Sequence, residues 1–161
     1  MKISKNLKND MAHAPEWFQR AINASPEEKV LGDVKGNISY SFWKSKSETS
    51  NLIILIHGTG AHKKWWYPIA PGLNSNAHVI SIDLPGMGDS DFRESYKVED
   101  FGDCVTSVIK HEKDINNSTY TYLVGHSLGG HVAGFVATEE KEIIDGLMII
   151  DTFIRPPNYD N

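Results

Sequence analysis

One serine stands in a turn of small residues that is suited to displaying a nucleophile. Ser127 lies in the segment GHSLG, residues 125–129, which satisfies the pattern G-x-S-x-G. The apolar, strand-like run YTYLVG precedes it, and the small-residue helical run GGHVAGFVA follows. A sharp strand-to-helix turn needs small neighbours, and its strain projects the serine hydroxyl above the sheet. A glycine-rich turn with an incidental serine is the alternative, but the flanking elements favour a nucleophile.

A glycine-rich loop after an earlier strand offers a second part of the same chemistry. The segment LIILIHGTG carries HGTG, residues 57–60, directly after an apolar run. Glycine lets the backbone approach a substrate closely, and a backbone N–H group there can stabilise a developing oxyanion. We expect the N–H groups of Thr59 and Leu128 to form an oxyanion hole for acyl transfer at Ser127.

Short strands and helices alternate along the chain and must position these residues. We expect strands at 28–34, 37–43, 52–56, 78–84, 120–125 and 146–151, and helices at about 63–73, 96–113 and 129–141, with a short helix opened by Pro15. Alternation of this kind predicts an α/β fold, in which a mostly parallel sheet is flanked by helices on both faces.

Length and composition indicate one globular domain spanning residues 1–161, with residues 1–13 loosely ordered. Hydrophobic residues make up 40% and charged residues 23% of the chain, as in globular proteins. The net charge of −5 favours neither nucleic acid nor an anionic membrane as a partner. Lys63 and Lys64 beside two tryptophans are too small a basic cluster to change that expectation. A small molecule is the expected partner if the protein is active.

Location and metal content follow from what the sequence lacks. The first ten residues have no apolar core and so are not a secretory signal, and no apolar run approaches the ~20 residues of a membrane helix. The single cysteine, Cys104, cannot form an internal disulfide and is expected to be a buried structural thiol. We expect a cytoplasmic protein with no metal and no cofactor.

Taken together, the motifs resemble the α/β-hydrolase family. The resemblance rests on LIILIHGTG, SIDLPGMGDSD, YLVGHSLGG and GLMIID, which occur in the family's order over roughly residues 27–151. It implies a serine hydrolase that acts on an ester-like or related small-molecule bond through Ser127. Gly86 and Gly88 are interpreted as turn residues rather than a phosphate cradle, because no third glycine follows at the required spacing.

The resemblance also implies a truncated fold. The six expected strands correspond to the family's first six, so the last two strands and the cap have no counterpart. The family orders its triad as serine, acid and histidine. Asp151, at the end of the sixth strand, is a candidate acid, although capping of a loop is the alternative. The base would come from sequence missing here, from a partner chain, or not at all.

None of the seven histidines is a convincing base. His57 belongs to the oxyanion loop and is interpreted as structural. His126, next to the nucleophile, should point elsewhere, and His131 should project from the following helix. The remaining four are interpreted as surface or loop residues: His13, His62, His78 and His111.

Two further expectations concern activity and association. Because loss of a triad can cost ~10⁶ in rate, the isolated chain should be a weak or inactive hydrolase; a catalytically dead half-fold, serving as an interaction module or interrupted-gene remnant, is the alternative. Trp65, Trp66 and Tyr67 either shape an apolar acyl pocket or pack in the core. The strand GLMII would be an exposed edge, where a second copy or a complementing C-terminal chain could bind.

Overall fold

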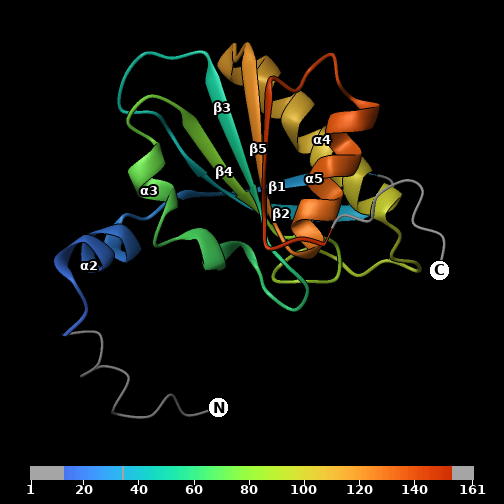
Figure 1. Cartoon of the computed structure of the whole chain (residues 1–161), viewed down its shortest axis with the longest axis horizontal. Helices are drawn as coiled ribbons and strands as arrows, with labels where there is room; N and C mark the ends of the chain where they lie inside the picture. Colours follow the sequence, from blue (N-terminus) through green and yellow to red (C-terminus); the bar gives the residue numbers. More distant parts are fainter. Residues whose placement is uncertain (1–12, 34, 154–161) are drawn as a thin grey trace.

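The computed structural model describes residues 13–33 and 35–153, and these form one six-stranded sheet with helices on both faces (Figure 1). The strands are β1 (Glu27–Asp33), β2 (Gly36–Trp43), β3 (Asn51–Ile56), β4 (His78–Ile82), β5 (Tyr120–His126) and β6 (Gly146–Ile150). The helical elements are α2 (Glu16–Asn23), η1 (Lys63–Trp66), α3 (Ala70–Leu73), α4 (Val98–Asn116) and α5 (Leu128–Glu139).

The strand order, β1-β2-β4-β3-β5-β6, brings the segments after β3, β5 and β6 together. β1 and β2 are antiparallel to their neighbours, whereas β4, β3, β5 and β6 are parallel to one another. In the register, Ile56 lies opposite Gly125, and His126 lies opposite Ile150. The carboxyl ends of parallel strands lie at the same end of a sheet. The loop after β3, the serine turn and Asp151 therefore all lie at the carboxyl end of these strands.

Most of the apolar core lies between the sheet and the pair of helices α4 and α5 (Figure 1). Alternate residues of β3 point to this side, as expected for a strand with period-2 side chains. The sheet contributes Ile38, Tyr40, Phe42, Leu52, Ile54, Ile56, Ile80, Ile82 and Leu123, and the helices contribute Phe101, Cys104, Val105, Val108, Ile109, Val132, Ala133 and Val136. Cys104 is buried, so the prediction of a buried thiol is confirmed.

A smaller cluster on the opposite face packs η1 and α3 against the sheet. It contains Trp43, Leu55, Trp66, Ala70 and Val79. The sequence predicted one helix over about 63–73, but the structure has two short pieces. Proline explains the break: Pro68 has no N–H group and so cannot donate the hydrogen bond that would continue the helix beyond Tyr67.

All six expected strands and the α/β architecture are confirmed, with strand ends that differ from expectation by a residue or two. The turn role of Gly86 and Gly88 agrees with their positive φ values of 74° and 59°. The expected loose order of residues 1–13 falls, except for His13, outside the described residues. In the described part of the chain no helix is long and apolar enough to cross a membrane, and the cytoplasmic location stays a prediction.

The two edges of the sheet differ in chemistry. β1 carries the charged residues Glu27, Glu28 and Lys29, and charge of this kind discourages pairing with another strand. β6 has the sequence GLMII, and among the described residues it is bordered by a strand on one side only. Leu147 and Met148 of β6 are 43% and 58% exposed. The apolar edge expected from the sequence is therefore present in the described sheet.

Candidate active site

Ser127 occupies a strained position between β5 and α5. Its backbone has φ 51° and ψ −117°, values that a residue with a side chain rarely adopts. Such strain costs about 1–3 kcal/mol and persists only when surrounding contacts enforce it. The serine turn therefore needs structural support from its neighbours.

Glycines at both ends of the motif provide that support by letting backbone segments touch. A Cβ atom added at Gly125 would lie 2.1 Å from the carbonyl oxygen of Gly129, and one added at Gly129 would lie 2.3 Å from that of Ile56. No side chain fits at either place. The start of α5 is thus pressed against both β5 and the end of β3.

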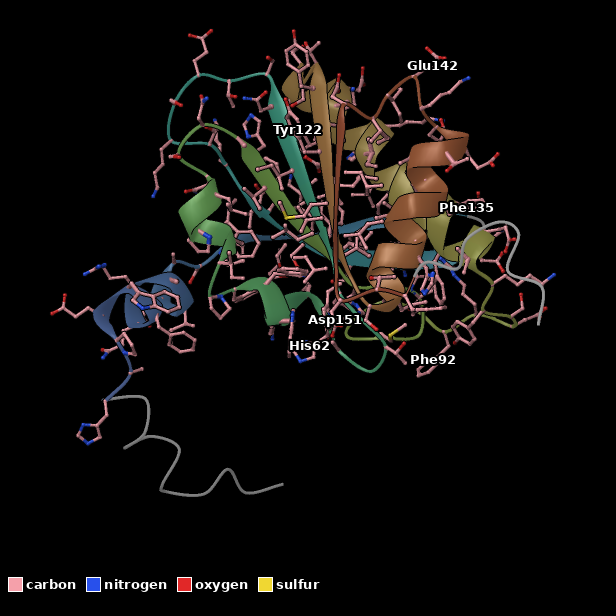
Figure 2. All side chains as sticks on the ribbon, in the orientation of Figure 1. His62, Phe92, Tyr122, Phe135, Glu142 and Asp151 are labelled. Carbon is pink, nitrogen blue, oxygen red and sulfur yellow. The ribbon has the colours of Figure 1, made fainter. Side chains whose placement is uncertain are left out.

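Hydrogen bonds attach the serine turn to the end of β6. The Ser127 N–H group donates to the carbonyl oxygen of Ile150 at 3.0 Å, and the Thr152 hydroxyl donates to the carbonyl oxygen of Ser127 at 3.0 Å. Asp151, between these two residues, has a positive φ of 48° and an exposed side chain. Figure 2 shows Asp151 at the same end of the sheet as His62. Its role as the triad acid stays a prediction.

The loop after β3, residues 57–62, faces the serine turn. A Cβ atom added at Gly58 would lie 3.1 Å from Ser127 Cβ and 3.0 Å from His126 Nδ1, so this glycine permits the approach of the two segments. Between them lies a cleft of about 130 Å³ lined by Gly58, Thr59, Ala61, Trp65, His126 and Ser127. The structure thus brings Ser127 and Thr59, which are far apart in sequence, to one cleft.

The two amides expected to form the oxyanion hole have no acceptor among residues 13–33 and 35–153. Neither the Thr59 N–H nor the Leu128 N–H makes a hydrogen bond there. For Leu128 this follows from its place as the first residue of α5, since the first amides of a helix lack intrahelical partners. Both donors are available to a ligand, and their role as an oxyanion hole stays a prediction.

His57 is structural, as the sequence analysis favoured. Its ring is buried; Nδ1 lies 2.8 Å from the carbonyl oxygen of Gly58, and Nε2 accepts the Leu84 N–H at 3.2 Å. Nε2 must therefore be unprotonated, which leaves the proton on Nδ1 to donate to Gly58. Burial lowers the pKa of the imidazole despite the Gly58 bond. A neutral ring with both nitrogens engaged has no means of taking a proton from Ser127.

The prediction for His126 was wrong, because its side chain does not point away from the site. The ring lines the cleft beside Ser127 and stacks on Trp65, with ring centroids 5.7 Å apart and planes 19° apart. Nδ1 is buried and has no hydrogen-bond partner in the described part of the chain. The missing side chain at Gly58 leaves room for the ring, a fact that the spacing of histidine and serine does not reveal.

None of the other described histidines lines the Ser127 cleft. His131 is exposed on α5, as expected, and His13, His62 and His111 are also exposed. His78 was expected at the surface but is buried at the start of β4. Its ring stacks on Phe42, and its Nδ1 accepts the Ser45 N–H at 3.3 Å.

The two tryptophans of η1 have different environments. Trp65 is 56% exposed and lines the cleft, so it remains a candidate pocket residue. Trp66 is 4% exposed and packs with Trp43 and Leu55, so of the two expected alternatives it takes the place in the core. In the one-turn helix η1, neighbouring side chains point in different directions, and only one of the pair reaches the cleft.

A buried charged cluster beside the site was not anticipated. Lys63 contacts Asp83 and Asp89, both of which lie in the motif SIDLPGMGDSD. The sequence signal for this cluster is the set of aspartates in that motif, but the sequence does not show which cation lies beside them. The positions of these groups matter for the loop that carries Thr59.

The fold, the strained serine turn and the facing glycine loop define a class of protein. Residues 51–160 match a family model described as the alpha/beta hydrolase fold. The chain belongs to the α/β hydrolase fold family.

Two curated relatives have the names of an esterase and a lipase. The chain is 31% identical over 112 residues to a pimeloyl-[acyl-carrier protein] methyl ester esterase of Neisseria meningitidis, covering 70% of this chain and 41% of the relative. It is 29% identical over 137 residues to monoacylglycerol lipase abhd6-A of Xenopus laevis, covering 83% of this chain and 39% of the relative. The chain therefore spans about two-fifths of the length of these relatives.

Solved structures also match this chain over about half of their own length. The thioesterase domain from the curacin biosynthetic pathway superposes with a TM-score of 0.72 and 26% identity, covering 84% of this chain and 49% of that one. A bacterial membrane phospholipase A gives a TM-score of 0.72 and 26% identity, covering 95% and 47%. These neighbours share the described fold along much of this chain.

Proposed function

We propose that the protein is a serine hydrolase that cleaves an ester-like or related small-molecule bond with Ser127 as the nucleophile. The strained backbone of Ser127, held at the mouth of a cleft opposite a glycine loop, carries the proposal. A strand-to-helix turn of this geometry displays a serine hydroxyl for attack. The names of the relatives, an esterase and a lipase, agree with an ester substrate.

In the proposed reaction, Ser127 Oγ attacks the carbonyl carbon of the ester and passes its proton to a general base. The carbonyl oxygen becomes an oxyanion, for which the N–H groups of Thr59 and Leu128 are proposed as donors. The bond to the alcohol then breaks, the alcohol takes the proton, and water hydrolyses the acyl-enzyme. Trp65 is proposed to form part of the acyl pocket, and Asp151 is proposed as the acid.

The base is proposed to come from sequence missing from these 161 residues, from a partner chain, or not at all. Two described histidines are poor candidates, since His57 has both nitrogens engaged and His131 is exposed on α5. A complete relative has more than twice the matched length. Because a general base is worth ~10²–10⁴ in rate, the 161-residue chain is expected to react slowly.

A fluorophosphonate probe tests the nucleophile directly. Reaction forms a bond from Ser127 Oγ to phosphorus and releases fluoride, and mass spectrometry locates the adduct. We expect labelling of the wild type at Ser127 and none of Ser127→Ala. Added imidazole should accelerate labelling, because it can act as an external general base.

The control variant is Ser107→Ala, which removes an exposed hydroxyl from α4 and should label like the wild type. Equal labelling of Ser127→Ala and wild type would contradict the proposal. So would the absence of a Ser127 adduct in the wild type even with imidazole present.

We infer a second property, association of two copies through β6, from the apolar edge of the sheet. Met148 is 58% exposed, and no described strand lies beyond β6. An unpaired apolar edge strand is a template for pairing with another chain. Antiparallel pairing of β6 with its own copy would give a closed, two-fold dimer.

Light scattering during size-exclusion chromatography tests this association. We expect a concentration-dependent dimer for the wild type and a monomer for Met148→Lys, because a charge on the edge opposes pairing. Val30→Lys makes the same kind of change on β1, where Val30 is 66% exposed, and should leave the dimer intact. A wild type that stays monomeric at all concentrations would sink the idea.

A further inference from the structure

Lys63 is buried, which is rare for a lysine, and it is surrounded by acceptors. The residue is 1% exposed. Its Nζ donates to Asp83 Oδ2 at 2.9 Å, to Asp89 Oδ2 at 2.6 Å and to Ser39 Oγ at 2.8 Å. Burial alone would lower the pKa of Lys63, but the hydrogen bonds with Asp89 and Asp83 outweigh it and raise the pKa. The ammonium therefore stays charged in the folded protein.

Asp83 joins the side chain and the backbone of the same lysine. Its Oδ1 accepts the Lys63 N–H at 2.5 Å while its Oδ2 accepts the Lys63 ammonium and, at 2.9 Å, the Asp89 N–H. A Cβ atom at Gly88 would lie 2.2 Å from Asp83 Cγ, so only glycine lets the loop fold over this carboxylate. The carboxylate is fully buried with three donors, an arrangement in which loss of one partner is strongly destabilising.

The contacts of Lys63 attach the C-terminal end of loop 57–62 to the segment that follows β4. A second set of contacts attaches the N-terminal end of the loop. At the start, His57 Nε2 accepts the Leu84 N–H at 3.2 Å. At the end, Ser81 Oγ donates to the Lys63 carbonyl oxygen at 2.7 Å, in addition to the Asp83 contacts. Residues 58–62, which include Thr59, thus span two fixed points, both held by residues 81–84 at the end of β4 and just after it.

We propose that Lys63 is a positioning residue, which holds loop 57–62 where the Thr59 amide faces the Ser127 cleft. Lys63 does not line that cleft, so it acts through the loop rather than on the substrate. This role rests on the proposed function of Ser127. A purely structural lysine would stabilise the whole fold, whereas a positioning lysine controls the mobility of the loop in particular.

The test uses Lys63→Met, which removes the charge and preserves side-chain length. Amide hydrogen exchange of residues 58–62 should accelerate by roughly tenfold to a hundredfold relative to α4, because the loop loses one anchor. Ser127 labelling by the fluorophosphonate should slow by roughly tenfold to a hundredfold, as expected when a catalytic group is misplaced by about 1 Å.

Two variants make the result specific. Lys64→Met makes the same chemical change at the exposed neighbouring lysine and should leave exchange of the loop as in the wild type. The Asp89 side chain is 70% exposed, and Asp89→Asn removes the charge of this one partner of Lys63. This variant should accelerate loop exchange to a smaller degree. Asp89→Asn also keeps the test decisive if Lys63→Met fails to fold.

Unchanged loop exchange in both Lys63→Met and Asp89→Asn would overturn the positioning role. Equal acceleration across the loop and α4 would also overturn it, since that result describes global destabilisation. Failure of the wild type to label at Ser127 would instead contradict the proposed function. In that case the exchange measurement still decides whether Lys63 holds the loop.

Discussion

Replacing Gly129 with alanine is expected to cost about 4 kcal/mol or more of unfolding free energy, a loss seen only for severe core disruption. The added methyl group would lie 2.3 Å from the carbonyl oxygen of Ile56 and 2.6 Å from that of His57. Both obstacles are backbone atoms at the end of β3, so neither moves without displacing loop 57–62. Urea unfolding followed by circular dichroism measures the loss.

Gly134→Ala is the matched control on the same helix. No atom lies within 4 Å of a Cβ added at Gly134, and alanine favours a helix over glycine by about 1 kcal/mol. We expect this variant to be slightly more stable than the wild type. If the two alanines had equal effects, the close approach of α5 to β3 would not be the reason for glycine at 129.

Replacing Glu112 with alanine is the second change with a large expected effect, a loss of about 3–5 kcal/mol. The carboxylate is fully buried on α4 and accepts hydrogen bonds from Tyr40 Oη at 2.6 Å and from Lys29 Nζ at 3.1 Å. Burial, followed by the bond to Glu112, raises the pKa of the Tyr40 hydroxyl. The alanine variant leaves the Lys29 ammonium, whose side chain is 18% exposed, without its counter-charge. Urea unfolding again measures the difference.

Two further variants test whether the charge of Glu112, rather than its volume, accounts for the loss of stability. Glu112→Gln keeps the shape and one acceptor, so its loss should be smaller than that of Glu112→Ala. Glu139→Ala removes an exposed glutamate of α5 and should change stability by no more than about 0.5 kcal/mol. A Glu112→Ala variant as stable as Glu139→Ala would show that the buried ion pair contributes nothing net.

The fold was predictable because strand periodicity and turn chemistry are local properties. The run LIILI is followed by Gly58 and Gly60, and YTYLVG leads into the serine motif, so both strands could be placed from neighbouring residues alone. The tight contacts at Gly125 and Gly129 explain why the motif needs glycine at these positions. Proline at 68 and 71 carried a similar local signal, but the single helix predicted over 63–73 did not take it into account.

The parts of the site that were not predicted depend on distant contacts. His126 turns into the cleft because Gly58, on another strand, leaves room for its ring. Trp66 is buried and Trp65 exposed, although the two share composition and neighbourhood. Lys63 and Lys64 are adjacent and look alike in the sequence. Only the packing of β4 against η1 distinguishes the buried Lys63 from the exposed Lys64.

The hydrogen bond from Ser127 to Ile150 has a consequence for how the protein folds. The bond, the contact of Gly129 with Ile56 and the bond from Thr152 all join segments distant in sequence. A chain must close long loops before such contacts form, and parallel strands make this step slow. Helix α4 forms its backbone hydrogen bonds locally, but the serine acquires its strained geometry only when β3, β5 and β6 are aligned. Reactivity at Ser127 would therefore report the completion of the sheet and not merely its collapse.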